Sequence, residues 1–320
     1  MNKSALVCGI SGQDGAYLAH FLCGKGYTVW GTSRDAQGTS FKNLARLGVM
    51  DKVRILSMDP EDFRSVFMAL RTSEPDEIYF LAGQSSVGLS FEQPAETIQS
   101  ITLGTLNVLE ACRLMENPVR LYHAGSSECF GDVTGLAANE NTPFHPRSPY
   151  AVAKASAFWL VDNYREAYSL FACTGLLFNH ESPLRPQRFV TKKIINAAKA
   201  IASGTSEKLV LGRLDIARDW GWAPEYVEAM WLMLQRDQPE DFVIATGKTH
   251  TLEEFVAEAF SAFDLDWRDH VIQEPSLFRP TDLSMSRGDP GKAEKMLGWR
   301  ATSYMTDVVR NLIKDTLPNA

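Results

Sequence analysis

Short apolar runs alternate with longer segments of helical periodicity through the first half of the chain. The runs are typical of strands buried inside a sheet, and the segments between them are long enough for helices. Strands are expected at residues 5–8, 28–31, 53–59, 77–87 (ending in a loop of small residues), 121–125 and 173–178, and a helix at 102–115. This alternation predicts an α/β fold built on a doubly wound, Rossmann-type parallel sheet.

The pattern changes after residue 178. Residues 189–193 open an amphipathic helix, and several arginines and prolines surround it. No repeat, low-complexity tract or obvious linker separates the two parts of the chain. We therefore expect a smaller, interleaved C-terminal substrate domain. The expected boundaries are 1–178 with about 217–245 for a dinucleotide-binding domain, and 179–216 with about 246–320 for the substrate domain.

The first predicted strand leads into a glycine-rich turn at residues 9–15 (Gly-Ile-Ser-Gly-Gln-Asp-Gly). Glycines at this spacing permit a tight strand-to-helix turn and let backbone N–H groups approach a pyrophosphate. The spacing differs from G-x-G-x-x-G, and a glycine-rich turn without a ligand is the alternative interpretation. The position between a strand and a helix favours a dinucleotide site.

Two further stretches carry candidate chemistry. Tyr150 and Lys154 are spaced i, i+4, so both lie on the same face of a helix. An ammonium beside a phenol favours phenolate, which makes Tyr150 a candidate general base or acid near neutral pH. Ser126 could donate a hydrogen bond to the same substrate oxygen, and Glu128 offers a carboxylate for a second proton transfer. The alternative is a chance YxxxK on a surface helix.

The end of the second predicted strand bears on the choice of cofactor. No acid follows it directly, and Arg34 precedes Asp35. A cation here favours a 2′-phosphate, so we expect NADP rather than NAD, with a plain loop charge as the alternative. After the fourth strand, Gln84 and Ser85 could hydrogen-bond a sugar, although they could equally form a simple turn.

The amino-acid composition excludes several classes of protein and several kinds of binding site. Hydrophobic and charged fractions of 45% and 22% are ordinary for a globular protein, and a net charge of −7 argues against a nucleic-acid surface. The five cysteines lack CxxC spacing and a neighbouring histidine cluster, so we expect buried thiols and no metal site. The sequence has no signal peptide and no apolar stretch of about 18 residues. We expect a cytoplasmic protein that does not bind a membrane.

Together these stretches resemble the extended short-chain dehydrogenase/reductase family, and within it the GDP-mannose 4,6-dehydratases. The resemblance spans nearly the whole chain. Residues 179–183 (Asn-His-Glu-Ser-Pro) are far more specific than the glycine turn or YxxxK. The other segments that carry it are 9–18, 126–128, 148–154, 163–168, 177–178, 218–221, 226–231 and 278–280.

The resemblance implies an NADP-dependent lyase that converts GDP-D-mannose to GDP-4-keto-6-deoxy-D-mannose, and a homo-oligomer, either dimer or tetramer. The implied catalytic residues are Ser126, Glu128, Tyr150 and Lys154. The implied cofactor-binding residues are Gly9, Gly12, Gln13, Asp14, Gly15, Arg34, Asp59, Leu81, Ala82, Tyr150, Lys154 and His180. Asp59 is expected at the adenine amino group or, from its position alone, as a helix N-cap. The expected substrate-binding residues are Gln84, Ser85, Asn179, Glu181, Val190, Lys193, Arg218 and Arg279.

The chain departs from the family pattern at several positions. Ser126 replaces a threonine, Pro186 a glycine and Arg213 an asparagine, and the family's double-arginine loop is not reproduced between Arg34 and Arg46. A 4-keto-sugar reductase or a nucleotide-sugar 4-epimerase on the same scaffold is the alternative enzyme. A non-catalytic nucleotide-sensing protein is the more remote one.

Overall fold

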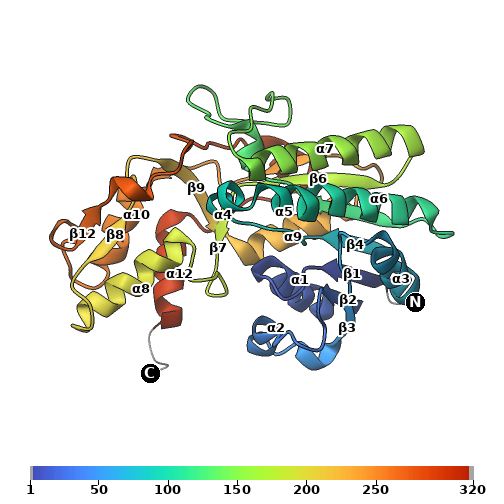
Figure 1. Ribbon diagram of the computed structural model, residues 1–320, viewed down its shortest axis with the longest axis horizontal. Helices are drawn as coiled ribbons and strands as arrows, with labels where there is room; N and C mark the ends of the chain where they lie inside the picture. The colour runs from blue at the N-terminus through green and yellow to red at the C-terminus, as the bar shows by residue number, and fades with distance from the viewer. Residues whose placement is uncertain (1–2, 317–320) are drawn as a thin grey trace.

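The computed structural model describes residues 3–316, which form a larger body and a smaller body beside it (Figure 1). Within this range, seven parallel strands build the central sheet in the order β10-β6-β5-β4-β1-β2-β3. The order reverses between β1 and β4, so the predicted Rossmann-type sheet is confirmed. The strands are Ser4–Cys8 (β1), Thr28–Ser33 (β2), Val53–Ser57 (β3), Glu77–Phe80 (β4), Arg120–Ala124 (β5), Ala172–Leu177 (β6) and Phe242–Ile244 (β10).

Alternate residues of β1 face opposite sides of the sheet, and each side is covered by helices (Figure 1). Ala5 and Val7 join one core cluster, whereas Leu6 and Cys8 join the other. The first side is covered by α1 (Gln13–Gly24), α2 (Lys42–Arg46), α9 (Ala223–Leu234) and α11 (Gly291–Leu297). The second is covered by α3 (Phe63–Ser73), α6 (Gly104–Leu114) and α7 (Pro149–Tyr168).

Two helical predictions need correction. The helix expected at 102–115 begins earlier, because α5 (Pro94–Ile98) runs through a π-helical segment, η2 (Gln99–Leu103), directly into α6. Helix α3 is capped by Asp62, whose side chain accepts a hydrogen bond from the Arg64 N–H, and not by Asp59. The Asp59 carboxylate accepts a hydrogen bond from the Glu61 N–H instead. Asp59 lies three residues before Asp62, which is too early in the chain to cap α3.

The smaller body contains a three-stranded sheet in the order β11-β9-β7 and a two-stranded sheet, β12-β8. Its main core forms where α8, α10 and α12 pack together over these strands. The strands are Asn179–Glu181 (β7), Leu209–Leu211 (β8), Ala217–Trp222 (β9), Thr249–Thr251 (β11) and Val271–Gln273 (β12). The helices are Val190–Ala202 (α8), Leu252–Ser261 (α10) and Met305–Thr316 (α12).

The chain passes repeatedly between the two bodies. The predicted sixth strand ends at Leu177, and the next residues form β7, which pairs with β9 in the smaller body. From β9 the chain returns through α9, which contacts α1, to β10, which pairs with β6. The smaller body is therefore interleaved with the larger one, as predicted.

Short elements complete the path. Four of them are 3-10 helices: Met50–Lys52 (η1), Ser127–Phe130 (η3), Trp267–Asp269 (η4) and Pro275–Leu277 (η5). The α4 helix (Val87–Glu92) follows β4. Of these, η3, η5 and α4 lie beside the cavities described below.

Candidate active site

Two adjoining cavities lie at the carboxyl ends of the central strands, where open parallel sheets bind ligands. The glycine-turn cavity, of about 960 Å³, lies over residues 9–15 and the end of β2. The Tyr150 cavity, of about 470 Å³, lies between α7, β7 and β9. The two share a wall formed by Asp14, Leu81, Ser85, Arg185, Arg188 and Phe189.

The glycine turn has the close packing that its sequence predicts. Gly9 has a φ of 86°, and a Cβ there would lie 3.0 Å from the Ala82 backbone nitrogen. A Cβ on Gly15 would lie 2.7 Å from the Ile10 Cα. Gly12 caps α1 without a side chain, so no side chain covers the first N–H groups of the helix. A diphosphate fits this arrangement, because the N–H groups and the positive end of the helix both face the cavity.

Arg34 lines the glycine-turn cavity at the end of β2. It is exposed, and within residues 3–316 it has no acidic partner. Asp35 is engaged locally, because its carboxylate accepts from the N–H groups of Gln37 (2.9 Å) and Gly38 (2.8 Å). Asp59 is exposed and does not line this cavity, whose wall here is Met58, Pro60 and Glu61.

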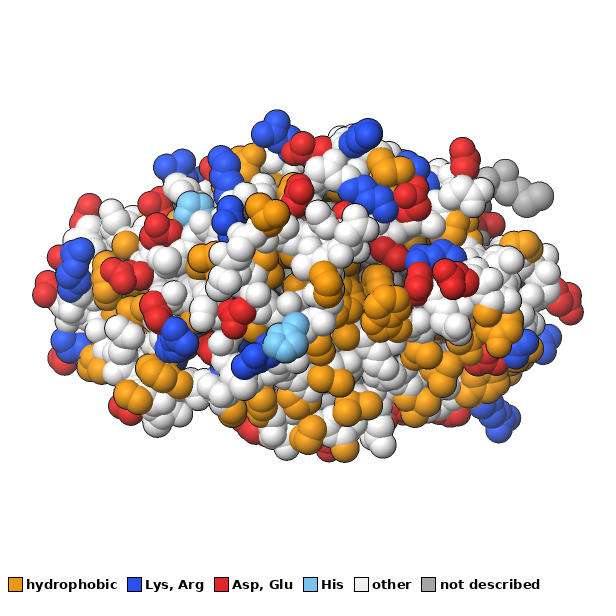
Figure 2. Space-filling view, turned by 90° about the horizontal axis from the view of Figure 1, so that it is seen from above, with side chains coloured by type: hydrophobic (Ala, Val, Ile, Leu, Met, Phe, Trp, Pro, Cys, Tyr) orange, Lys and Arg blue, Asp and Glu red, His pale blue; other side chains and the backbone are white. Residues whose placement is uncertain are grey.

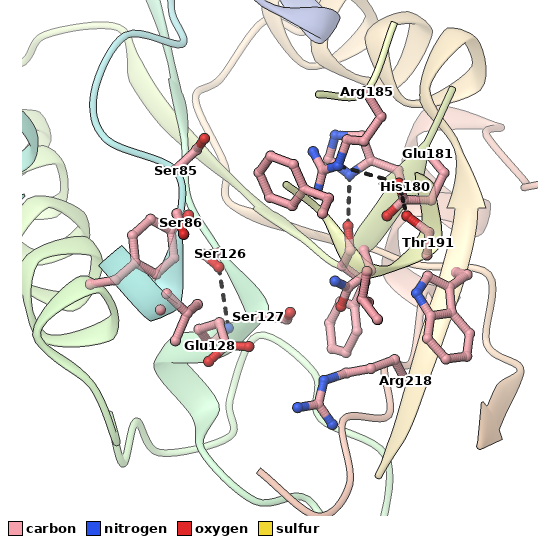
Figure 3. A pocket seen from close by; sticks show the side chains of 18 of the residues that line it. Ser85, Ser86, Ser126, Ser127, Glu128, His180, Glu181, Arg185, Thr191 and Arg218 are labelled. Atoms are coloured by element: carbon pink, nitrogen blue, oxygen red, sulfur yellow. Dashed lines mark hydrogen bonds and ion pairs between the residues drawn. The ribbon is translucent and has the colours of Figure 1, made fainter. Parts of the chain in front are cut away.

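The four candidate catalytic residues meet in the Tyr150 cavity. Ser126 and Glu128 follow β5, and Figure 3 shows both pointing toward the space that faces Arg218. Tyr150 and Lys154 lie on the first two turns of α7, which starts at Pro149 under a Ser148 cap that accepts from the Ala151 N–H.

Burial acts against the phenolate that the sequence analysis expects Lys154 to favour. Burial raises the pKa of Tyr150 above its ordinary value, although the Ser126 hydroxyl acts in the opposite direction. The Lys154 ammonium lies 5.9 Å from the centre of the Tyr150 ring and donates to the Ala124 carbonyl oxygen at 2.8 Å. Burial also lowers the pKa of Lys154 to about 8.

Glu128 is a half-buried carboxyl close to two arginines. Burial raises the pKa of its carboxyl, while Arg218 and Arg279 act to lower it. Its backbone N–H donates to the Ser126 hydroxyl at 3.3 Å, which fixes the start of η3. A carboxyl with a raised pKa keeps its proton to a higher pH than an exposed glutamate would.

A cationic wall faces these residues. Arg218 on β9 is 5% exposed and donates to the carbonyl oxygens of Ala217 (3.0 Å) and Leu283 (2.9 Å). Its other terminal nitrogen lies 3.2 Å from Asp282, and Arg279 lies 3.6 Å from the same carboxylate. Sequence reasoning missed Asp282. The available signal was that Asp282 follows Arg279 by three residues, a spacing that allows the two charges to pair. Guanidinium groups held in this way suit phosphate oxygens.

The remaining substrate-binding candidates fall into two groups. Asn179, Glu181, Val190 and Lys193 all line the Tyr150 cavity. Glu181 is 2% exposed, accepts from the Thr191 hydroxyl at 2.7 Å and lies 3.2 Å from Arg185. Lys193 donates to a carbonyl oxygen of β8 at 2.7 Å.

Gln84 and Ser85 behave differently. Ser85 lines both cavities, whereas Gln84 lines only the glycine-turn cavity among those described here. The Gln84 amide donates to the Ser86 carbonyl oxygen (2.7 Å) and to the Thr97 hydroxyl (3.2 Å). Gln84 therefore braces the loop after β4.

Sequence reasoning also missed the shared wall. Arg185 lies 3.8 Å and Arg188 5.1 Å from the centre of the Phe189 ring, so both cations lie against one aromatic ring between the cavities. The sequence shows two arginines after the Asn-His-Glu-Ser-Pro stretch, but their spacing does not indicate which cavity they face. Further lining residues that it missed are Leu211, Gly212, Ile216, Trp220, Leu252 and Leu277.

Residues 3–316 offer neither a membrane-spanning helix nor a metal site. None of the helices there is long and apolar enough to cross a bilayer. The same part of the chain has no group of three or more histidine, cysteine, aspartate or glutamate side chains arranged to hold a metal ion.

Comparison with known proteins agrees with this geometry. The family model described as GDP-mannose 4,6 dehydratase matches residues 6–312. The chain is 45% identical to GDP-mannose 4,6 dehydratase 1 of Arabidopsis thaliana, over 98% of this chain and 90% of that protein.

Solved structures share the fold. The UDP-glucose 4-epimerase of Thermus thermophilus in complex with NAD superimposes with a TM-score of 0.86 at 26% identity, over 98% of both chains. RMD from Pseudomonas aeruginosa in complex with NADPH gives a TM-score of 0.81 at 22% identity, also over 98% of both chains. From the family match and the sequence identity, the chain belongs to the GDP-mannose 4,6-dehydratase family of extended short-chain dehydrogenases/reductases.

Proposed function

We propose that this protein converts GDP-D-mannose to GDP-4-keto-6-deoxy-D-mannose, with an NADP cofactor that is reduced and reoxidised within each turnover. The observation that carries the proposal is Glu128, which shares one cavity with Ser126, Tyr150 and Lys154 and faces Arg218. A reductase or epimerase requires no carboxyl group for an elimination. The loss of water from C5 and C6 does, because one proton must leave C5 and another must reach the departing hydroxyl.

The glycine-turn cavity fits a nicotinamide dinucleotide. Open N–H groups at the start of α1 would hold its diphosphate, and Lys154 would hold its nicotinamide ribose. Arg34 favours the 2′-phosphate of NADP over NAD, since Arg34 lacks a described acidic partner and Asp35 is engaged by its own loop. Relatives of this fold bind either NAD or NADPH. Asp59 at the adenine stays a prediction.

When bound, the oxidised nicotinamide would supply a hydride acceptor and a positive charge that favours the Tyr150 phenolate. Tyr150 would take the proton of the C4 hydroxyl, while Ser126 donates a hydrogen bond to the same oxygen. The resulting ketone acidifies the C5 proton, which Glu128 would remove. Glu128 would then donate a proton to the departing C6 hydroxyl. Its raised pKa suits both steps, because it must act first as a base and then as an acid. C6 of the resulting 5,6-alkene would take back the hydride and C5 a proton from the solvent, which gives the 6-deoxy sugar and leaves no net change in the cofactor.

The far wall of the Tyr150 cavity would bind the nucleotide. Arg218 and Arg279 would hold the diphosphate, with Asp282 fixing the direction of both guanidinium groups. Ser85 on one side, and Asn179, Glu181, Val190 and Lys193 on the other, are the residues we assign to the rest of the substrate. Gln84, which lines the neighbouring cavity, would contribute by holding the loop that carries Ser85. The substrate domain would thus comprise 179–216 with about 246–320, and the dinucleotide-binding domain 1–178 with about 217–245.

We further propose a cytoplasmic homo-oligomer. All five cysteines are free thiols and four are buried, which suits a reducing compartment. Figure 2 shows hydrophobic side chains gathered over part of the larger body. Exposed apolar side chains of α5, η2, α6 and α7 support an interface between copies: Ile98, Leu103, Leu114, Val152, Trp159 and Tyr168. Sedimentation of the purified protein measures the oligomeric state.

The test is incubation with GDP-mannose and catalytic NADP⁺ in D₂O, followed by NMR of the product. We expect a 4-keto-6-deoxy sugar with deuterium at C5 and no net formation of NADPH. Unchanged GDP-mannose would refute the proposal. Turnover of a 4-keto sugar with stoichiometric NADPH consumption would identify a reductase instead, and interconversion of C4 epimers would identify an epimerase.

A further inference from the structure

The imidazole ring of His180 lies between two hydrogen-bond acceptors. Its Nδ1 atom is 2.7 Å from the Phe178 carbonyl oxygen, and its Nε2 atom is 2.9 Å from the Asp14 carboxylate. A carbonyl oxygen and a carboxylate can only accept, so each ring nitrogen must donate a proton of its own. Only the imidazolium form carries both protons. The contacts therefore favour the imidazolium form of His180.

The surroundings of the ring favour this charge. Three groups that can carry charge face it: Asp14 from α1, Arg185 from the loop after β7, and Tyr226 from α9. Tyr226 stacks on the ring with centres 4.5 Å apart, and an aromatic face attracts a cation. Burial and Arg185 oppose the charge, but Asp14 prevails and raises the pKa of His180. Burial opposes the charge on Asp14 too, yet His180 holds the pKa of that carboxyl at about 2.

The ion pair joins the walls of the two cavities. Asp14 lies in the first turn of α1, whereas His180 lies on β7 between Asn179 and Glu181 (Figure 3 shows His180 beside Glu181). Gln13 strengthens the same junction. Its amide nitrogen donates to the His180 carbonyl oxygen at 3.2 Å, and its oxygen accepts from the Ser182 hydroxyl at 2.8 Å. The first helical turn and β7 are thus held together by buried polar contacts.

A carboxylate beside the proposed diphosphate site also needs a counter-charge. Asp14 lines both cavities, and an unpaired negative charge at the start of α1 would repel the phosphates of a dinucleotide. The His180 imidazolium neutralises it from the substrate side. The net charge beside the glycine turn consequently depends on whether β7 holds His180 against Asp14.

We propose that Asp14 and His180 are positioning residues that couple the two cavities, so that NADP and the GDP moiety of the substrate each strengthen the binding of the other. This inference rests on the proposed function. A ligand in either cavity fixes the Asp14–His180 junction, and the second ligand then binds to walls that are already ordered. The coupling requires the imidazolium and is lost as the pH rises through the pKa of His180.

Calorimetry of NADP⁺ binding, with and without saturating GDP, measures the coupling. In the wild-type protein we expect GDP to lower the Kd of NADP⁺ by about 5-fold or more, the usual lower range for coupled sites. Asp14→Asn and His180→Gln should each abolish most of this factor, and the double variant should resemble either single one because the two residues act as a pair. His20→Gln, on α1 but outside both cavities, is the matched control.

Nitrogen-15 NMR tests the protonation state independently of ligands. The His180 signals, assigned by their loss in His180→Gln, should show two protonated ring nitrogens at neutral pH, and Asp14→Asn should lower the pH at which one proton is lost. A neutral ring at pH 7 would overturn the inference. The inference would also be overturned if GDP did not change the Kd of NADP⁺ in the wild-type protein, or if Asp14→Asn and His180→Gln kept the wild-type change. Failure of the wild-type protein to bind NADP⁺ or GDP would refute the proposed function as well. Normal turnover by the wild type, together with variants whose coupling equals that of the wild type, would refute only this inference.

Discussion

Replacing Glu128 with glutamine is the sharpest test of how the site works. The change removes a proton acceptor but keeps the size of the side chain and the backbone N–H that donates to Ser126. General acid–base groups contribute about 10²- to 10⁴-fold in rate, which corresponds to about 3–5 kcal/mol of activation free energy. We expect a fall in kcat within this range. We expect little change in NADP⁺ affinity, because Glu128 does not line the glycine-turn cavity.

The reaction step at which Glu128→Gln stops distinguishes the loss of this carboxylate from general damage to the enzyme. In the proposed mechanism C4 oxidation needs Tyr150 and not Glu128, so in a single turnover NADPH absorbance should rise and persist. Deuterium from D₂O should not enter C5. Glu92→Gln makes the same chemical change on the exposed side of α4 and should behave like the wild type.

The pH dependence adds a second signature. Burial raises the pKa of the Glu128 carboxyl, so the basic form that removes the C5 proton is lost as the pH falls through this raised value. The wild-type rate should therefore decline at a higher pH than an exposed glutamate would give, and Glu128→Gln should lack this decline. Full activity of Glu128→Gln, or deuterium at C5 in its product, would refute the assignment.

Three further predictions concern other parts of the molecule. Tyr150→Phe should slow the first hydride transfer by about 10²-fold or more, measured as NADPH formation in a single turnover, and an unchanged rate would require another base. Arg34→Ala should weaken NADP⁺ binding in calorimetry but leave NAD⁺ binding nearly unchanged, and equal losses for both would remove its role at the 2′-phosphate. Glu77 is fully buried and accepts from Lys3 (2.8 Å) and Tyr79 (2.7 Å). Because the Lys3 side chain is about half exposed, Glu77→Gln leaves no buried charge unpaired and should lower the free energy of unfolding by about 1–3 kcal/mol in urea titrations. A loss below about 1 kcal/mol would show that this carboxylate contributes little.

Local rules account for the parts of the structure that the sequence predicted. Buried strands appear as apolar runs, the glycine turn follows from its lack of Cβ atoms, and an i, i+4 spacing places Tyr150 and Lys154 on one face of α7. These features depend on residues close together in the chain, so one sequence is enough to find them.

The features that it missed depend on contacts between distant segments. Asp282 meets Arg218 across 64 residues, and His180 meets Asp14 across 166. Neither pair leaves a spacing pattern. The raised pKa of Tyr150 could not be foreseen from the sequence for a related reason, because burial depends on packing from several elements.

The interleaved path has a consequence for synthesis. The central sheet lacks its edge strand until β10 (Phe242–Ile244) has emerged from the ribosome, and the core of the smaller body needs α12 (Met305–Thr316) as well. Neither body can therefore finish folding while the chain is still short, although domains commonly fold in turn as they are made. A nascent chain halted near residue 216 would expose the edge of β6 and the side of α1 that α9 later covers. Production of this protein should accordingly depend on chaperones more than that of an enzyme whose two domains follow one another along the chain.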